Sequence, residues 1–272
     1  MDEIRTLPGE GWGIALRRFG EGPTVTLCLH GFLEDGDSFA ALAEALPGHC
    51  LLAPDMPFHG QSSWSTANPL SPDTLIDALL QCPELQQGPF GLLGYSMGGK
   101  VALSIFQRIP DRISHLLLVA PDGLRPSPVH LFFTHTWLGD RILWCSLTNP
   151  GWLYPLLTLL RQCKMMNESQ HRFVLSYLQD VPMRERVYRI WTTLRYFQPS
   201  PRQVQALIRQ YPIPVRLIFG RYDRLCPVAL GQRFLQPIAG QVELQVFETG
   251  HLLLRDKHAQ QLAKAFPALP TN

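Results

Sequence analysis

The chain has 272 residues, with 24 basic and 22 acidic side chains and a formal net charge of +2. This length suits a single α/β core that carries an insertion. A net charge of +2 is too small to give the positive electrostatic field that attracts nucleic acid. We therefore expect a small-molecule partner and no nucleic acid. The six cysteines are scattered without a Cys-x-x-Cys pair, which favours reduced thiols.

The N-terminal stretch "MDEIRTLPGEGWG" has early acidic residues and lacks the apolar segment of a secretory signal. No run in the chain approaches the roughly 18 apolar residues that a membrane-spanning helix needs. We therefore expect a soluble, cytoplasmic protein without an integral membrane span.

Strand-like runs and helical patterns alternate along most of the chain. The strand-like runs are, in order, "GIALRRF", "TVTLCLH", "HCLLAP", "PFGLLGY", "SHLLLVAP", "PVRLIFG" and "VELQVFE". The helical patterns are "DSFAALAEAL", "SPDTLIDALLQC" with Ser71 as the N-cap, "MGGKVALSIFQRI", "PVALGQRFLQPI" and "DKHAQQLAKAF". This alternation predicts an α/β fold with a mostly parallel open sheet and helices on both faces.

Residues 122–200 interrupt the alternation with about eighty residues that lack a clear strand and are rich in aromatics. We expect a core domain of residues 1–121 and 201–272, with a helical cap of residues 122–200 inserted after the strand at 114–120. The cap is predicted to be a lid whose apolar underside lines a substrate pocket, although it could simply add core. Its "WLYPLLTLL" stretch favours core packing over an interfacial contact, and its excess of basic residues favours solvated helix faces over binding of an anionic substrate or lipid.

The stretch "GYSMGG" places Ser96 between Gly94 and Gly98, after a strand-like run and before a helical pattern. A serine hydroxyl is a weak nucleophile that needs a base, a group to orient the base, and donors for the developing oxyanion. G-x-S-x-G in this context is the nucleophile-elbow pattern, in which the glycines permit a tight turn that exposes the hydroxyl. A glycine-rich turn with an incidental serine is the alternative.

Two further segments add to this pattern. "LHGF" ends at Phe32, directly after a strand-like run, and "DMPFHGQS" spans residues 55–62. With "GYSMGG", they resemble the α/β-hydrolase fold family in its serine-nucleophile branch, over nearly the whole chain. The second segment is similar to the family's D-x-P-G-x-G-x-S loop, with Phe58 and His59 in place of the usual glycine and its neighbour. The resemblance implies an esterase- or lipase-like enzyme with a helical lid.

In this family the acid and then the histidine follow the serine. "VELQVFETGHLLL" supplies His251 just beyond the last strand-like run, and the resemblance makes it the base. Asp223, in "LIFGRYDRLCP", follows the preceding run and is the expected acid, because a carboxylate there can orient the histidine. Asp122 occupies a position where some relatives carry the acid and stays an alternative, whereas Asp55 is expected to hold its own loop.

By the same resemblance, the backbone N–H groups of Phe32 and Met97 form the oxyanion hole. The sequence contains no phosphate-binding loop, no His-Glu-x-x-His motif and no cysteine-histidine cluster. We therefore expect no cofactor and no metal.

These observations predict a serine hydrolase that cleaves a carboxylic ester or a related acyl substrate through an acyl-enzyme, and the expected substrate is a small molecule with an apolar portion. One alternative is a lyase or a carbon-carbon bond hydrolase with the same triad. "HGFLEDGDSF" and "GYSMGGKVAL" are similar to menaquinone-pathway lyases, which eliminate pyruvate from an anionic intermediate, although Lys100 stands where those enzymes tend to carry arginine. The other alternative is a module on the same fold that only binds a small ligand.

Overall fold

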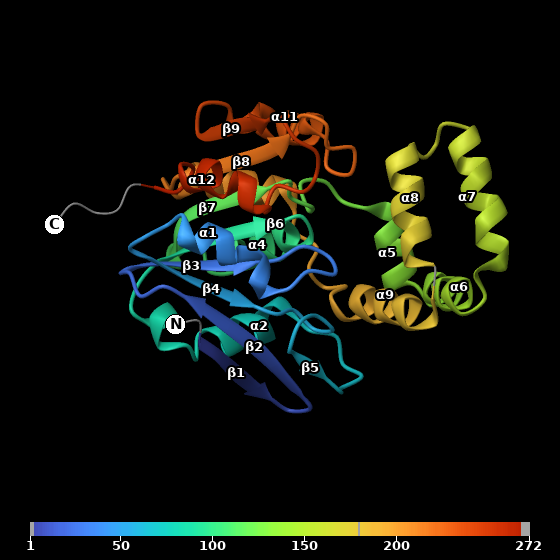
Figure 1. Ribbon diagram of the computed structural model, residues 1–272, viewed down its shortest axis with the longest axis horizontal. Helices are drawn as coiled ribbons and strands as arrows, with labels where there is room; N and C mark the ends of the chain where they lie inside the picture. Colours follow the sequence, from blue (N-terminus) through green and yellow to red (C-terminus); the bar gives the residue numbers. More distant parts are fainter. Residues whose placement is uncertain (1–2, 179, 268–272) are drawn as a thin grey trace. The chain divides into compact units, whose positions relative to one another are not determined.

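The centre of the structure is an open, mostly parallel β-sheet (Figure 1). The computed structural model describes residues 3–178 and 180–267, without the side chain of Phe173. Within them the sheet has nine strands in the order β1-β2-β4-β3-β6-β7-β8-β9, and β5 pairs with β2. The pairs that include β2 are antiparallel and the remaining pairs are parallel. The predicted sheet architecture is confirmed.

The seven strand-like runs of the sequence all form strands. They are β2 (Trp12–Phe19), β3 (Thr24–Leu29), β4 (His49–Pro54), β6 (Phe90–Tyr95), β7 (Ile113–Val119), β8 (Val215–Gly220) and β9 (Val242–Phe247). Two strands were not predicted, β1 (Glu3–Gly9) and the short β5 (Ser63–Trp64). Most of the β1 residues are exposed, so this edge strand lacks the apolar run by which the others could be identified.

The predicted helical segments of the core are present, and the sequence missed two further helices. The segments correspond to η1 (Gly36–Phe39) with α1 (Ala40–Glu44), α2 (Pro72–Leu79), α4 (Met97–Phe106), α11 (Val228–Leu235) with η4 (Gln236–Ile238), and α12 (Asp256–Ala263). The missed helices are α3 (Pro83–Gln86) and α10 (Pro201–Gln210), and a short η2 (Pro110–Arg112) precedes β7. The Ser71 hydroxyl accepts a hydrogen bond from the Thr74 amide, 3.0 Å away, which confirms the predicted N-cap of α2.

Helices cover both faces of the sheet because alternate strand residues point to opposite sides. On one face, Leu93 and Leu117 of the central strands pack in one apolar cluster with Leu42, which follows the start of α1, and Leu262 of α12. On the other face lie α2 and α4, which contact each other, while α4 also contacts β3, β6 and β7. The central strands are therefore buried on both sides, as a parallel sheet requires.

The chain divides into two compact units. The core unit comprises the described residues of Met1–Ala67, Ser71–Pro126 and Phe197–Asn272, and the helical unit comprises Asn68–Leu70 and Ser127–Tyr196. The helical unit is shorter than the expected cap of residues 122–200, because the chain returns to the core unit at Phe197, which is fully buried. Ser200 then donates a backbone hydrogen bond to the Gln107 side chain at the end of α4.

The helical unit is built from α5 (Pro128–His135), α6 (Trp137–Thr148), η3 (Pro150–Trp152), α7 (Leu153–Gln162), α8 (Glu168–Tyr177) and α9 (Val181–Thr193). Helix α6 contacts both α5 and α9, and the Tyr188 hydroxyl of α9 donates a 2.8 Å hydrogen bond to Asp140 of α6. The Trp144 ring packs edge-on against Tyr188. The short segment 68–70 joins the unit through a hydrogen bond from the Leu70 amide to the Thr193 carbonyl.

Within residues 3–178 and 180–267, no helix combines the length and the apolar character needed to cross a membrane. The longest helix among them, α9, has 13 residues. The expected cytoplasmic location stays a prediction.

Candidate active site

The residues singled out in the sequence follow the carboxyl ends of four adjacent parallel strands. Ser96 follows β6, Asp122 lies three residues beyond β7, Asp223 lies beyond β8, and His251 follows β9. The carboxyl ends of parallel strands share one edge of a sheet, which is where open α/β sheets bind their ligands. The topology thus brings side chains that are far apart in sequence to one edge.

Ser96 sits in a strained turn between β6 and α4. Its backbone has φ 51° and ψ −117°, a conformation that is costly for a residue with a side chain. The turn is held by hydrogen bonds from the Ser96 amide to the Val119 carbonyl and from the Asp122 amide to the Ser96 carbonyl, at 3.0 and 2.8 Å. A Cβ atom at Gly98 would collide with the Leu29 carbonyl, so glycine is required where α4 passes the end of β3.

Three side chains form a hydrogen-bonded series at this edge. His251 Nδ1 lies 2.7 Å from Asp223 Oδ2, and His251 Nε2 lies 2.9 Å from Ser96 Oγ. Because a carboxylate can only accept hydrogen bonds, Nδ1 carries the proton in this arrangement. Nε2 is then the acceptor for the Ser96 hydroxyl proton.

The carboxylate of Asp223 is fixed on both oxygens. Its side chain is buried, and Oδ1 accepts hydrogen bonds from the Leu225 and Cys226 amides at 2.8 and 2.9 Å. Oδ2 is thereby directed at the imidazole of His251. Asp122 is exposed instead, and its Oδ1 accepts a bond from the Gly123 amide. The structure therefore brings Asp223, and not Asp122, to His251.

The expected oxyanion donors lie on the two segments that flank the serine turn. Met97 is the first residue of α4, where backbone N–H groups have no partner within the helix. Phe32 lies in the loop after β3, and the close approach of Gly98 to the Leu29 and His30 carbonyls packs the first turn of α4 against the end of that strand. The positive end of the α4 dipole also lies at Met97, where the helix begins.

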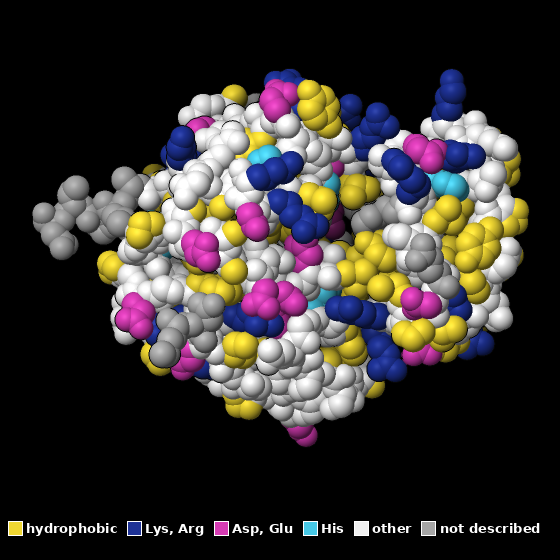
Figure 2. Space-filling view, in the orientation of Figure 1, with side chains coloured by type: hydrophobic (Ala, Val, Ile, Leu, Met, Phe, Trp, Pro, Cys, Tyr) yellow, Lys and Arg dark blue, Asp and Glu magenta, His cyan; other side chains and the backbone are white. Residues whose placement is uncertain are grey.

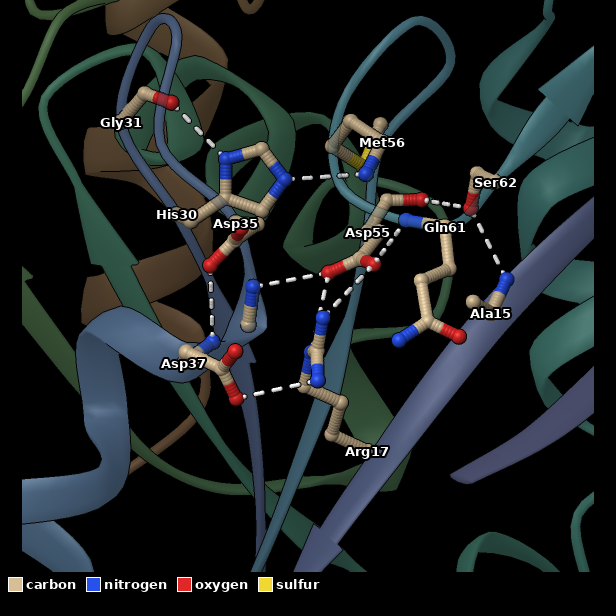
Figure 3. A network of polar contacts seen from close by, with 11 residues as sticks. Ala15, Arg17, His30, Gly31, Asp35, Asp37, Asp55, Met56, Gln61 and Ser62 are labelled. Carbon is tan, nitrogen blue, oxygen red and sulfur yellow. Dashed lines mark hydrogen bonds and ion pairs between the residues drawn. The ribbon is translucent and has the colours of Figure 1, made fainter.

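His30 holds the loop after β3 from within the core (Figure 3). Its buried ring accepts a hydrogen bond at Nε2 from the Met56 amide, 2.9 Å away, so Nδ1 carries the proton and donates to the Gly31 carbonyl at 2.8 Å. His30 makes both bonds as a neutral imidazole, in which one ring nitrogen accepts a hydrogen bond and the other donates one. His30 thus joins the loop after β3 to the loop after β4.

Asp55 makes a second connection between the same two loops. Its fully buried carboxylate accepts hydrogen bonds from the Gly36 amide at 2.8 Å and from the Gln61 amide at 2.7 Å (Figure 3). The Arg17 guanidinium lies 3.4 Å from Asp55 and 3.0 Å from Asp37. From the sequence, Asp55 was expected to hold its own loop. The structure shows that it also binds the amide of Gly36, which lies in the loop after β3.

Two residues near His251 were missed in the sequence. The Tyr95 hydroxyl donates a 3.0 Å hydrogen bond to the His251 carbonyl, and burial raises the pKa of that hydroxyl. Burial also raises the pKa of the Glu34 carboxyl, while a backbone hydrogen bond from Gly31 and the neighbouring His251 lower it by a smaller amount. The Glu34 carboxyl and the Tyr95 ring lie on the same side of Gly31. A Cβ atom placed on Gly31 would be 3.1 Å from Glu34 Oε2 and 3.0 Å from the Tyr95 ring. Glu34 is therefore close to the residues around His251.

Lys100 is buried in α4, four residues after Ser96. Burial lowers the pKa of its ammonium group, and the nearby carboxylate of Asp122 opposes this shift. Among the residues that the structure describes, no group of three or more His, Cys, Asp or Glu side chains could hold a metal ion.

Comparison with known proteins shows which family and which proteins the chain resembles. A family model described as alpha/beta hydrolase fold matches residues 24–143, which contain the Ser96 turn and both loops of Figure 3. An uncharacterized hydrolase of Bacillus subtilis (strain 168), YugF, is 26% identical over 265 residues, or 94% of each chain. The chain has the alpha/beta hydrolase fold that the sequence predicted.

A further relative and a solved structure extend this likeness. Human monoacylglycerol lipase ABHD6 is 27% identical over 248 residues, which is 88% of this chain and 73% of the relative. A solved structure of a thermophilic esterase from Thermogutta terrifontis superimposes with a TM-score of 0.66 at 20% identity, covering 97% and 96% of the two chains, and shows the shared fold. Because the sequence relatives are named hydrolases and lipases, the expectation of an α/β-hydrolase enzyme is confirmed.

One departure from the α/β-hydrolase pattern has a structural consequence. Phe58 stands where the D-x-P-G-x-G-x-S loop usually has glycine, and its φ is 64°, in the left-handed region that disfavours a bulky side chain. Gly60 in the same loop also has positive φ, and a Cβ atom there would collide with the Asp55 carboxylate. The loop therefore keeps the left-handed backbone at residue 58 without the glycine that would relieve its strain.

Proposed function

We propose that the chain is a serine hydrolase that cleaves a carboxylic ester through an acyl-enzyme. The observation that carries the proposal is the series Asp223–His251–Ser96, with hydrogen-bond distances of 2.7 and 2.9 Å. These three residues follow the serine, acid, histidine order of α/β-hydrolases along the chain. A hydroxyl, a base and an orienting carboxylate are the groups that nucleophilic acyl transfer requires.

In the acylation step, Ser96 Oγ attacks the ester carbonyl carbon while its proton passes to His251 Nε2. The Asp223 carboxylate stabilises the imidazolium that forms, without taking its proton. The carbonyl oxygen becomes an oxyanion, and the backbone N–H groups of Phe32 and Met97 are its proposed donors. When the tetrahedral intermediate collapses, the alkoxide leaves with the proton from His251, and the acyl group stays on Ser96.

In the deacylation step, His251 accepts a proton from water, and the resulting oxygen attacks the acyl carbon. The bond to Ser96 Oγ breaks, the serine recovers its proton from the imidazolium, and a carboxylic acid leaves. Two carbonyl additions at one pre-organised site replace a single difficult hydrolysis.

An ester with an apolar portion is the proposed substrate. The relatives named monoacylglycerol lipase and esterase support a carboxylic ester, and the aromatic-rich segment of residues 122–200 supports an apolar acyl or alkyl group. We further propose that this segment serves as the lid of the enzyme, because it is inserted directly after β7, whose carboxyl end lies at the candidate site.

A panel of p-nitrophenyl esters with graded acyl chains, together with a fluorophosphonate probe, tests the proposal. The wild-type chain is expected to hydrolyse at least one ester and to react with the probe, whereas Ser96→Ala does neither. Ser104→Ala is a matched control, because that hydroxyl is buried in α4 and bonds to the Lys100 carbonyl. Probe labelling that persists in Ser96→Ala would exclude Ser96 as the nucleophile, and labelling without any ester turnover would favour lyase or carbon-carbon bond chemistry.

A further inference from the structure

Tyr95 is the last residue of β6 and directly precedes Ser96. Only 2% of Tyr95 is exposed, so its ring and hydroxyl lie beneath the surface that Figure 2 draws. The ring belongs to the apolar cluster on one face of the sheet, together with Leu93 of the same strand and Leu253, which lies two residues after His251. Tyr95 therefore joins the strand that carries the serine to the loop that carries the histidine.

Two contacts connect Tyr95 to His251. The Tyr95 hydroxyl donates a hydrogen bond to the His251 backbone carbonyl, 3.0 Å away. The Tyr95 ring also packs beside the imidazole, with the ring centroids 5.6 Å apart and the planes inclined by 31°. The same carbonyl accepts a second hydrogen bond from the Leu253 amide, at 2.9 Å. Both acceptor positions of the His251 carbonyl are therefore occupied.

The contacts of His251 hold different parts of the residue. Asp223 and Ser96 contact the two ring nitrogens, at 2.7 and 2.9 Å. Tyr95 and Leu253 contact the backbone instead. In the proposed reaction the hydrogen bond from Ser96 is lost when its oxygen is acylated, and it returns only after deacylation. The bond from Tyr95 involves no proton that moves in either step, so it can hold the histidine throughout.

The surroundings of the loop and of the ring differ in tightness. A Cβ atom at Gly250, the residue before His251, would meet no described atom within 4 Å, so this side of the loop is open. A Cβ atom at Gly31 would lie only 3.0 Å from the Tyr95 ring, so the loop after β3 packs closely against that ring. A tightly packed tyrosine thus holds a loop that has open space beside its histidine.

The Tyr95 hydroxyl acts through position and not through charge. Burial raises the pKa of this hydroxyl, and the carboxylates of Glu34 and Asp223 act in the same direction. Cys226 adds to the effect, whereas the charge of Arg255 opposes it. An ordinary tyrosine already keeps its proton up to about pH 10. The hydroxyl therefore remains a donor at every pH at which the histidine gains or loses its proton.

We propose that Tyr95 is a positioning residue, which holds the backbone of His251 so that Nε2 stays aligned with Ser96 through both steps of ester hydrolysis. The inference rests on the proposed function, because it assigns Tyr95 a part in that reaction. Tyr95 acts through the histidine and not on the reacting atoms. A displacement of about 1 Å can lower the rate of an enzyme about a hundredfold, so a single bond to the backbone of the base affects catalysis.

Tyr95→Phe tests the proposal, because it removes the hydroxyl and keeps the buried ring. With the best p-nitrophenyl ester, we expect kcat and kcat/KM to fall together by about tenfold, as for an interaction that matters in the transition state. The loss is expected to be the same from about pH 6 to about pH 9, with the acid limb of the pH profile unmoved. Amide hydrogen exchange of residues 248–255 is expected to become faster.

Tyr222→Phe is the matched control. The Tyr222 hydroxyl donates a 3.1 Å hydrogen bond to Glu248, which precedes His251 in the same loop, but Tyr222 is 64% exposed. Water replaces an exposed hydrogen bond at little cost, so this variant is expected to keep the wild-type kcat. Thermal unfolding shows that both variants are folded.

The outcomes separate this inference from the proposed function. The inference is overturned if Tyr95→Phe keeps kcat within about twofold of wild type, or if Tyr222→Phe loses as much. A shift of the acid limb by about half a pH unit or more in Tyr95→Phe would also overturn it, because it would assign Tyr95 an electrostatic role. If the wild-type chain hydrolyses no ester, the proposed function fails, and hydrogen exchange then decides. Faster exchange in Tyr95→Phe supports the hold on His251, and unchanged exchange overturns it.

Discussion

Replacing Asp223 by asparagine reverses the hydrogen bonding of His251 with almost no change in shape. Oδ1 of Asp223 accepts two backbone N–H groups, so the asparagine carbonyl oxygen takes that position and its NH₂ group faces the imidazole. The NH₂ group donates to Nδ1, which moves the imidazole proton to Nε2. Nε2 can then no longer accept the proton of Ser96, 2.9 Å away.

The expected loss in kcat is on the order of 10⁴-fold, the cost of holding a catalytic histidine in the wrong tautomer. This corresponds to about 5 kcal/mol of transition-state stabilisation. Hydrolysis of the best p-nitrophenyl ester measures it, with thermal unfolding to show that the variant is folded. Asp122→Asn is the matched control and should retain near-normal turnover. The reasoning is refuted if Asp223→Asn keeps a rate within tenfold of wild type, or if Asp122→Asn carries the large loss.

Three further predictions concern the scaffold. Burial lowers the pKa of His115 from 6.5 to about 4. The unfolded chain therefore binds a proton at this residue more readily than the folded chain does. The stability that neutral His115 contributes is present above pH 6.5 and is lost as the pH falls toward 4. Urea unfolding should show a decrease of up to about 3 kcal/mol over that range, and an equally steep decrease in His115→Gln would contradict this assignment. Gly98→Ala should cost about 1–3 kcal/mol and most of the activity because its Cβ meets backbone, whereas Gly88→Ala, with open space around it, should be near neutral in the same assays. Asp55→Asn leaves the buried Arg17 without its buried carboxylate and should cost about 3 kcal/mol in urea unfolding, so a loss below about 1 kcal/mol would speak against the network.

The parts of the site that chemistry dictates could be predicted from the sequence. Ser96 lies in a motif whose glycines are required by a steric conflict, as Gly98 shows against the end of β3. Asp223 and His251 follow recognisable apolar strands, and parallel pairing brings the ends of such strands together. Residue type and strand position, read with the serine, acid, histidine order that the family resemblance implies, therefore selected the residues that the structure joins by hydrogen bonds.

The parts that depend on tertiary contact could not be predicted. Tyr95 and Glu34 carry no signal of their own, because their relation to His251 arises only when β6, the loop after β3 and the loop after β9 meet. The bond from Asp55 to Gly36 likewise joins two loops that the sequence presents separately. Strand β1 was missed because its side chains are mostly exposed.

The stretch "WLYPLLTLL" in the helical unit is a further case in which the sequence alone could not show which side chains are buried. Its composition predicted core packing, and Leu157 is indeed buried. The neighbouring Leu156 and Leu159 are exposed, because a helix that is apolar on two sides can bury only the side that meets a partner. Periodicity identifies the two apolar sides, but only the packing of α7 against α8 shows which side is buried.

Trapping the acyl-enzyme is the most direct measurement of the central claim. The wild-type chain is mixed with an ester that it hydrolyses, quenched in acid during turnover, and analysed by mass spectrometry of the intact protein and its peptides. The account predicts a mass increase equal to one acyl group, located on Ser96, with faster accumulation than decay in the first turnover. An acyl group on another residue, or turnover with no covalent adduct at any quench time, would contradict it.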